Sequence, residues 1–88
     1  MTEHESKLCA MAERTIRQLL IEGHKQGHVD DGFLVDPDFH FGRAVRHLAT
    51  ARLMKDGHQE LDAEGVDGHL RRALCRMAMG IYCSERGI

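Results

Sequence analysis

The sequence contains no tryptophan, a single proline and few aromatic residues, three Phe and one Tyr among 88 residues. So few aromatic side chains leave little material for the core of a chain that buries only about 60–65% of its unfolded surface. Apart from Pro37, nothing prevents long helices. We therefore expect one small domain, residues 1–88, whose core is completed by self-association into a homodimer or another homo-oligomer.

The sequence also lacks a large excess of positive or negative charge. It contains 12 Lys and Arg and 14 Asp and Glu, for a net charge of −2. Without a basic surplus, binding to nucleic acid is not expected. No apolar run approaches the ~20 residues that span a bilayer, and the polar segment Met1–Ser6 does not begin a signal peptide. The sequence therefore predicts a cytoplasmic protein with no membrane partner.

Cysteine is scarce, and its pattern is unpaired. Cys9, Cys75 and Cys83 show neither a disulfide framework nor the Cys-x-x-Cys spacing of structural zinc sites. We expect reduced thiols, with all three side chains serving as small core residues.

The first predicted helix runs from about Thr2 to Glu22. Thr2 and Glu5 have the spacing of a capping box. Gly23 and Gly27 are expected to end the helix. Between these signals, apolar residues recur at helical spacing along one face. The stripe comprises Leu8, Met11, Ala12, Thr15, Ile16, Leu19 and Leu20.

A loop, residues 27–38, follows, in which Phe33–Val35 are expected to form a short extended piece held on the core. The second helix is predicted over about Phe39–Lys55, with Asp38 as its N-cap and Gly57 just beyond its end. Its shared face comprises Phe41, Ala44, Val45, Leu48, Ala49 and Arg52.

The third helix is predicted to begin at Asp62 or Asp67 and to end near Ser84. Its apolar residues give the clearest helical period in the chain. They are Val66, Leu70, Ala73, Leu74, Met77, Ala78 and Ile81. The short connector before it favours an antiparallel hairpin of the second and third helices. The predicted fold class is therefore all-α, with three helices.

Seven histidines in so short a chain are its most unusual feature. His24 and His28 have the i, i+4 spacing of a metal pair, but glycines interrupt that turn, which favours a polar helix end. His47 and His69 are more informative. In an antiparallel hairpin they would line one cleft, with Asp62 near the connector.

Imidazoles and carboxylates around one cleft can hold Mg²⁺ or Mn²⁺, here through Asp62, Glu64 and His69. Arginines beside them can bind phosphate oxygens. The candidates are Arg43, Arg46 and Arg72. An alternative stays open, in which Asp62 only caps a helix, the arginines are solvated, and the two histidines hydrogen-bond across the hairpin.

Three short motifs, Arg46-His47-Leu48, Asp62-x-Glu64 and His69-Leu70-x-x-Ala73, occur in this order. Over residues 41–80 this pattern resembles the small, mostly phage-encoded dATP/dGTP diphosphohydrolase-like proteins. The resemblance implies an all-α fold and metal-dependent release of pyrophosphate from a deoxynucleoside triphosphate. The catalytic residues that it implies are His47, Asp62, Glu64 and His69, with Arg46 as a phosphate contact. The chain lacks the Trp-containing segment and the Glu-x-x-Glu helix associated with such proteins.

Two functional hypotheses follow from these observations. The first is a nucleotide-binding protein, either a metal-dependent deoxynucleoside triphosphate pyrophosphatase or a relative that only binds nucleotide. The second is a small helical interaction module, a dimeric regulator or inhibitor of a larger partner, favoured by the thin core and by methionines that adapt to partner surfaces. A DNA-binding helix is disfavoured by the net negative charge.

Overall fold

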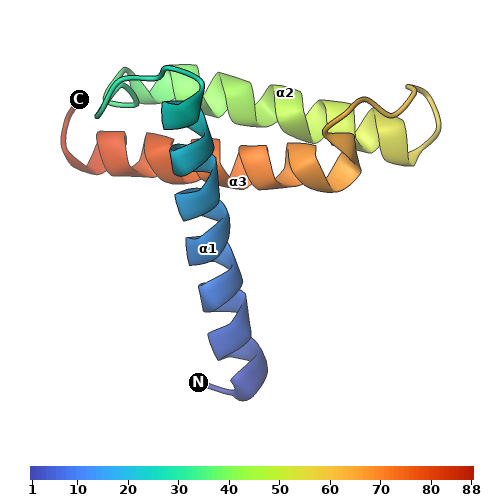
Figure 1. Ribbon diagram of the computed structural model, residues 1–88, viewed down its shortest axis with the longest axis horizontal. Helices are drawn as coiled ribbons and strands as arrows, with labels where there is room; N and C mark the ends of the chain where they lie inside the picture. The colour runs from blue at the N-terminus through green and yellow to red at the C-terminus, as the bar shows by residue number, and fades with distance from the viewer. The chain divides into compact units, whose positions relative to one another are not determined.

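The computed structural model describes all residues, 1–88, and contains three α-helices and no strand (Figure 1). The helices are α1 (Glu3–Lys25), α2 (Pro37–Lys55) and α3 (Gly65–Glu85). They belong to two compact units, Met1–Asp30 with α1 and Asp31–Ile88 with α2 and α3. The predicted all-α class is confirmed. None of the helices combines the length and the apolar character needed to cross a membrane.

The first unit begins with the predicted capping box. The Glu5 amide donates to Thr2 Oγ1 at 3.1 Å, and the Thr2 amide donates to Glu5 Oε1 at 2.7 Å. This reciprocal pair satisfies two amides that a helix start would otherwise leave unbonded. The beginning of α1 was therefore correctly predicted from these two residues.

The end of α1 lies beyond the predicted Glu22. Gly23 keeps the helical conformation, and the chain leaves the helix only at Gly27, where φ is +93° and an L side chain would be strained. His24 Nδ1 lies 3.2 Å from the His28 carbonyl oxygen, so the imidazole bonds to the backbone that leaves the helix. This contact agrees with a polar helix end.

In the second unit, α2 begins two residues earlier than predicted, and Asp36 replaces Asp38 as the N-cap. The Asp36 carboxylate accepts the amide hydrogen of Asp38 at 2.9 Å. Pro37 fits the first helical position, where its missing N–H would have had no helical partner. Residues Phe33–Val35, expected to be extended, form a turn and a bend and no strand.

The start of α3 falls between the two predicted positions. The helix begins at Gly65, where φ is +69°. Asp62 Oδ1 accepts the amide hydrogens of Glu64 at 3.0 Å and Gly65 at 2.9 Å. Asp62 therefore caps α3 from the connector without being its first residue.

Helices α2 and α3 pack against each other as the predicted antiparallel hairpin (Figure 1). The residues between them follow alternating spacings of four and three, as in coiled coils. We call them the seam. On α2 the seam comprises His40, Ala44, His47, Ala51 and Met54, and on α3 His69, Ala73, Arg76, Gly80 and Cys83; they are buried or bonded across the hairpin.

The apolar faces read from the sequence share only Ala44 and Ala73 with this seam. Their large side chains on α2 are exposed, from 38% at Phe41 to 65% at Val45. On α3, Leu70, Met77 and Ile81 fall within this range, whereas Val66 and Leu74 are half-buried. The seam is made instead of small and polar residues, which allow the helices a close approach.

Close approach is clearest at Gly80, where a Cβ atom would overlap the ring of Phe41. The cysteines add to the same small-residue core, since Cys75 and Cys83 are buried. Cys9 is exposed, so its predicted place in the core is wrong. All three thiols are free, as predicted.

Candidate metal centre

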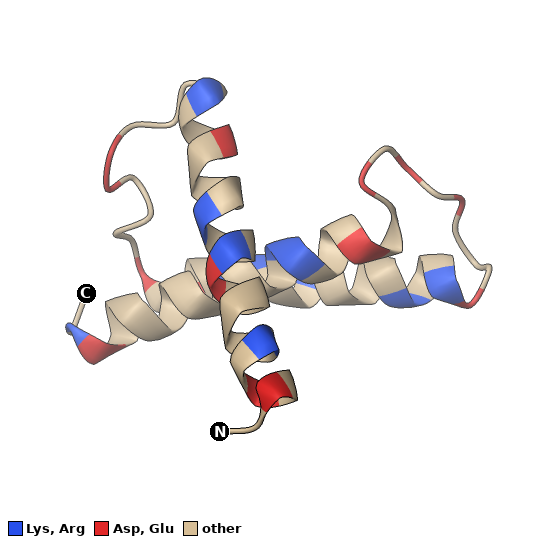
Figure 2. Cartoon of the chain, turned by 60° about the horizontal axis from the view of Figure 1, so that its bottom comes forward, with Lys and Arg blue, Asp and Glu red and all other residues tan.

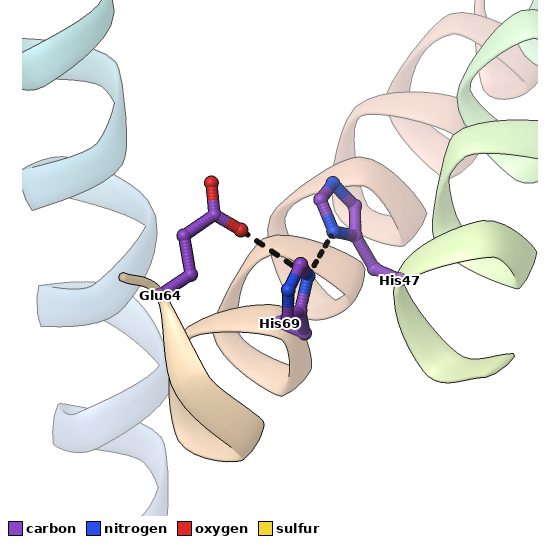
Figure 3. Close-up of side chains that lie close together, drawn as sticks. All are labelled: His47, Glu64 and His69. Atoms are coloured by element: carbon purple, nitrogen blue, oxygen red, sulfur yellow. Dashed lines mark hydrogen bonds and ion pairs between the residues drawn. The ribbon is translucent and has the colours of Figure 1, made fainter. Parts of the chain in front are cut away.

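The antiparallel hairpin brings His47 of α2 and His69 of α3 face to face, although 22 residues separate them in the sequence (Figure 3). Their Nδ1 atoms lie 2.9 Å apart, and their ring centroids 5.2 Å apart. The predicted hairpin therefore does bring these two imidazoles together, in the contact expected in the alternative prediction.

Asp62 approaches His69 from the other side of its ring. Asp62 Oδ2 lies 2.7 Å from His69 Nε2, while its second oxygen caps α3. The hydrogen bond from His69, followed by the one from the amide of Gly65, lowers the pKa of the Asp62 carboxyl below its usual value. Asp62 therefore stays ionised and accepts the Nε2 proton of His69.

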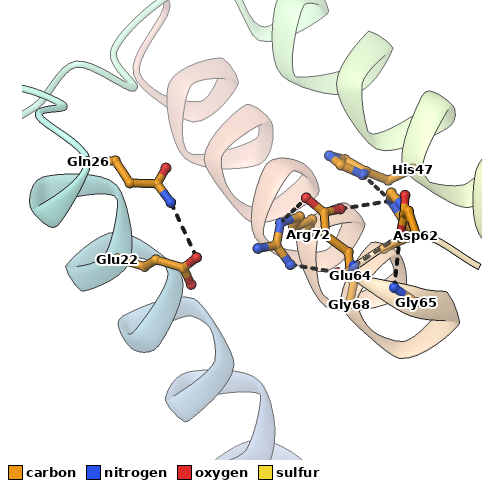
Figure 4. A network of polar contacts seen from close by, with 9 residues as sticks. Glu22, Gln26, His47, Asp62, Glu64, Gly65, Gly68 and Arg72 are labelled. Atoms are coloured by element: carbon orange, nitrogen blue, oxygen red, sulfur yellow. Dashed lines mark hydrogen bonds and ion pairs between the residues drawn. The ribbon is translucent and has the colours of Figure 1, made fainter.

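Glu64 approaches the opposite nitrogen of the same ring. Its Oε2 lies 3.2 Å from His69 Nδ1, and its Oε1 lies 3.3 Å from Arg72 Nε. Arg72 also donates from Nη1 to the Gly68 carbonyl oxygen at 3.3 Å. Figure 4 shows how this guanidinium holds one carboxylate oxygen and leaves the other directed at the imidazoles.

Three atoms consequently meet at one place: His47 Nδ1, Glu64 Oε2 and His69 Nδ1. Ligand atoms of these residues all lie within 4.8 Å of one another. We call this group the three-donor cluster. His69 is buried, whereas His47 and Glu64 are partly open to solvent. Acidic segments also mark the connector beside it (Figure 2), which favours a cation here.

The hydrogen bonding of His69 directs an electron pair into this cluster. Because its Nε2–H is directed at Asp62, a neutral His69 turns the Nδ1 lone pair toward the Glu64 carboxylate and His47. A neutral His47 can donate an Nδ1–H to this lone pair; with its proton on Nε2 instead, His47 turns a third electron-pair donor toward the same point. In that second tautomer the three donors can hold a metal ion.

Electrostatics around His47 favour its neutral form. Burial of the ring, and then the neighbouring His69, lower the pKa of His47 below its usual 6.5, while Glu64 acts in the opposite direction. A neutral imidazole is the form that binds metals. The sequence prediction had not included His47 among the metal ligands; it had named Asp62, whose oxygens are both engaged elsewhere.

The donor set is a poor match for the Mg²⁺ that the resemblance implies. Mg²⁺ prefers oxygen ligands in octahedral geometry, and Mn²⁺ shares that preference for oxygen. The three-donor cluster supplies two imidazole nitrogens and one carboxylate oxygen. This combination is typical of zinc and of other transition metals that imidazole binds well.

The candidate phosphate-binding arginines lie in different surroundings. Arg43 places its guanidinium carbon 5.2 Å from the centre of the Phe39 ring, and Arg76 reaches the same ring at 5.6 Å. Burial, and then the nearby charge of Arg43, lower the pKa of Arg76. Arg46 is exposed and lies outside this group.

Arg76 was missing from the sequence-based set of phosphate contacts. A signal for it was present, because it follows His69 by seven residues and therefore shares its face of α3. The apolar period of α3 obscured that signal, since the large apolar residues define a different face of the helix.

Comparisons of this chain with protein-family models, with curated proteins and with solved structures find no match. The likeness to the dATP/dGTP diphosphohydrolase-like proteins, carried by the three short motifs within residues 41–80, therefore stays a prediction. What the chain does has to be argued from its own residues.

Proposed function

We propose that the α2–α3 hairpin binds a deoxynucleoside triphosphate, with the phosphates between Arg43, Arg76 and a metal ion at the three-donor cluster. One observation carries the proposal: the three-donor cluster and two guanidiniums follow one another along the same hairpin. Arginine is suited to phosphate because its planar donors match the phosphate oxygens.

The order along the hairpin supports a single extended ligand. Arg43 precedes His47 by four residues, and Arg76 follows His69 by seven. Because the helices are antiparallel, both arginines lie on the same side of the histidine pair, about 6 and 10 Å from it along the helix axes. A nucleoside triphosphate is long enough to contact both places.

Both arginines are available to an anion. Each lies near the Phe39 ring, and neither forms an ion pair with a carboxylate of this chain. Their proximity to each other costs electrostatic energy, since the charge of Arg43 lowers the pKa of Arg76. A bound phosphate would relieve this repulsion.

A metal ion with an open position polarises a phosphoryl oxygen and makes attack by water at phosphorus easier. In the reaction that the resemblance implies, water attacks the α-phosphorus and the bond to the bridging oxygen breaks, giving a nucleoside monophosphate and pyrophosphate. Measured pyrophosphate release would assign the chain to the enzymes. Metal-dependent binding without release would assign it to relatives that only bind nucleotide.

The test is calorimetric titration of the full chain with dATP, dGTP, ATP and pyrophosphate, each with Zn²⁺, Mn²⁺ or Mg²⁺. Arg43→Gln removes one charge-assisted contact and is expected to weaken binding about 10- to 100-fold. Arg52→Gln is the matched control, because Arg52 is also exposed on α2 but pairs with Asp56. Absence of nucleotide binding with every metal, or equal effects of the two variants, would refute the proposal.

A second candidate function, the interaction module, is favoured by the exposed apolar faces of α2 and α3. Val45, Leu48, Leu70 and Ile81 leave large apolar side chains in solvent, more than a stable small monomer usually shows. We propose that a second copy of the chain, or a larger protein, covers them. Light scattering after chromatography tests the first case.

In that experiment Ile81→Glu is expected to convert an oligomer into a monomer. Leu61→Glu changes an exposed leucine of the connector and serves as the control. A wild-type chain that is monomeric at high concentration would exclude a homo-oligomer. The free thiols of Cys75 and Cys83 fit a reducing compartment, so we also propose the cytoplasm as the location.

A further inference from the structure

We infer that His47 Nδ1, His69 Nδ1 and Glu64 Oε2 form a binding site for a zinc-class ion, with Asp62 and Arg72 holding the ligands in place. This inference rests on the proposed function in one respect, since it names the metal class of the same site. It changes the expected cofactor from Mg²⁺ or Mn²⁺ to Zn²⁺, and it changes Asp62 from a ligand to a positioning residue.

The spacing of the donors already approaches that of a zinc site. Two ligands of a tetrahedral ion, each about 2.1 Å from it, are about 3.4 Å apart. His69 Nδ1 lies 3.2 Å from Glu64 Oε2 and 2.9 Å from His47 Nδ1. The ligand atoms of His47 and Glu64 lie within 4.8 Å of each other, and these two half-exposed side chains can move to close around the ion.

The ligand residues also have hydrogen-bond partners of the kind found around metal sites in proteins. A metal-bound histidine usually donates its other ring N–H to a carboxylate, which fixes the ring and its tautomer. Asp62 provides this carboxylate for His69 at 2.7 Å. Arg72 binds the oxygen of Glu64 that faces away from the imidazoles. Two of the three ligands thus have a partner that orients the donor atom toward the same point.

The remaining argument is the orientation of the lone pairs. With the Nε2 proton of His69 committed to Asp62, its Nδ1 lone pair points at Glu64 and His47, and His47 adds a second nitrogen donor when its own proton is on Nε2. Three protein ligands also leave a fourth position open, as in zinc sites that carry out chemistry.

The first experiment titrates the metal-free full-length chain with Zn²⁺ in competition with a chromogenic chelator, and repeats the titration with Co²⁺ followed by visible absorption. One ion per chain is expected, with no competition from millimolar Mg²⁺. His47→Ala and Glu64→Gln are each expected to weaken zinc binding by 100-fold or more. Circular dichroism checks that both variants, whose changed side chains are partly exposed, keep the helical fold.

Matched controls come from histidines outside the cluster. His58→Ala in the connector and His28→Ala in the first unit change exposed imidazoles and should leave zinc affinity unaltered. Zinc binding that survives His47→Ala and Glu64→Gln, or that is lost with His58→Ala or His28→Ala, would overturn the inference. Equal affinities for Mg²⁺ and Zn²⁺ would also overturn it.

The positioning role of Asp62 has its own readout. Asp62→Asn can still accept the amide hydrogens that cap α3, but it no longer presents a charged acceptor to His69 Nε2. Zinc affinity is expected to fall about 10- to 100-fold, and the Co²⁺ absorption bands to shift, because the basicity of the ligating imidazole changes. A purely structural Asp62 would leave the Co²⁺ spectrum unchanged.

The zinc site and the nucleotide site fail separately. If zinc binds through the cluster and no nucleotide binds with any metal, the proposed function is wrong and the zinc site stands. If nucleotide binds with Mg²⁺ equally well in the wild-type chain and in His47→Ala, the zinc inference is wrong and the nucleotide function stands.

Discussion

Two polar pairs lie on the same seam one heptad apart, His40 with Arg76 and His47 with His69, and the groups around their imidazoles differ. At one, His40 is 1% exposed; its Nε2 donates to the Phe33 carbonyl oxygen at 2.6 Å, and its Nδ1 lies 3.2 Å from Arg76 Nη1. At the other, His69 has a carboxylate on each side of its ring and His47 in front of it.

The difference decides the role of each imidazole. Arg76 can only donate, and a carbonyl oxygen can only accept, so neutral His40 satisfies both neighbours with one tautomer. His69 faces acceptors at both nitrogens, and no single neutral tautomer satisfies them. A histidine on a helix seam is therefore structural or metal-binding according to the donors and acceptors that its neighbours provide.

The largest expected effect comes from replacing His40, the imidazole with the structural role. His40→Ala leaves a cavity and an unpaired guanidinium donor in the seam, and should lower the free energy of unfolding by about 3 kcal/mol. His47→Ala, at a half-exposed position, should cost about 1 kcal/mol. Urea unfolding measures both. Similar losses in the two variants would contradict the division of roles.

Zinc should stabilise the folded chain only through the His47–His69 pair. At a hundredfold excess over its dissociation constant, Zn²⁺ is expected to raise the free energy of unfolding of the wild-type chain by about 2.7 kcal/mol. The same addition should leave His47→Ala unchanged, whereas a folded His40→Gln variant should respond like the wild type. Thermal unfolding with and without zinc makes the comparison, and stabilisation of His47→Ala would place the ion elsewhere.

The close packing of α2 against α3 near Gly80 can be tested by replacing Gly80 or Gly42 with alanine. Gly80→Ala places a Cβ atom against the Phe41 ring and should destabilise the hairpin by about 1–3 kcal/mol. Gly42→Ala meets nothing within 4 Å on α2, and should stabilise it by about 0.5–1 kcal/mol because alanine favours the helix. Opposite signs in urea unfolding are expected; a neutral Gly80→Ala would show that the helices can separate.

The smallest expected effect is a decline in the free energy of unfolding as the pH falls. His47 has a lowered pKa in the folded chain, so unfolded chains bind more protons as the pH falls below 6.5, and stability declines until the pH passes below its folded pKa. Asp62 also has a lowered pKa and adds a second decline below pH 3.8. His47→Ala should flatten the first decline, and His58→Ala should not. An unchanged profile in His47→Ala would contradict the shift.

Much of the fold could be predicted because its signals act over a few residues. The capping box of α1 joins residues three apart, and the α3 cap joins Asp62 to residues two and three positions on. Glycines with positive φ follow α1 and α2. The errors were equally local: Pro37 moved the N-cap of α2 to Asp36, and a helical Gly23 let α1 continue.

The seam could not be predicted from periodicity. Hydrophobic residues define one face on each helix, while small and polar residues define the face that packs, and a pattern search weights the larger side chains. The close approach at Gly80 shows why the face with small residues forms the helix contact. Bulky residues there would hold the helices apart.

The sequence by itself determined three helices, the capping box of α1 and the presence of imidazoles and carboxylates near the connector, since these depend on neighbours along the chain. The tertiary structure decided which donors meet. The His47–His69 contact joins residues 22 apart and the Arg76–His40 contact residues 36 apart. Such contacts depend on the register of α2 against α3, which close packing of the seam fixes. That register turns His47 toward His69 and Glu64, the other members of the three-donor cluster, and leaves Asp62 to orient His69.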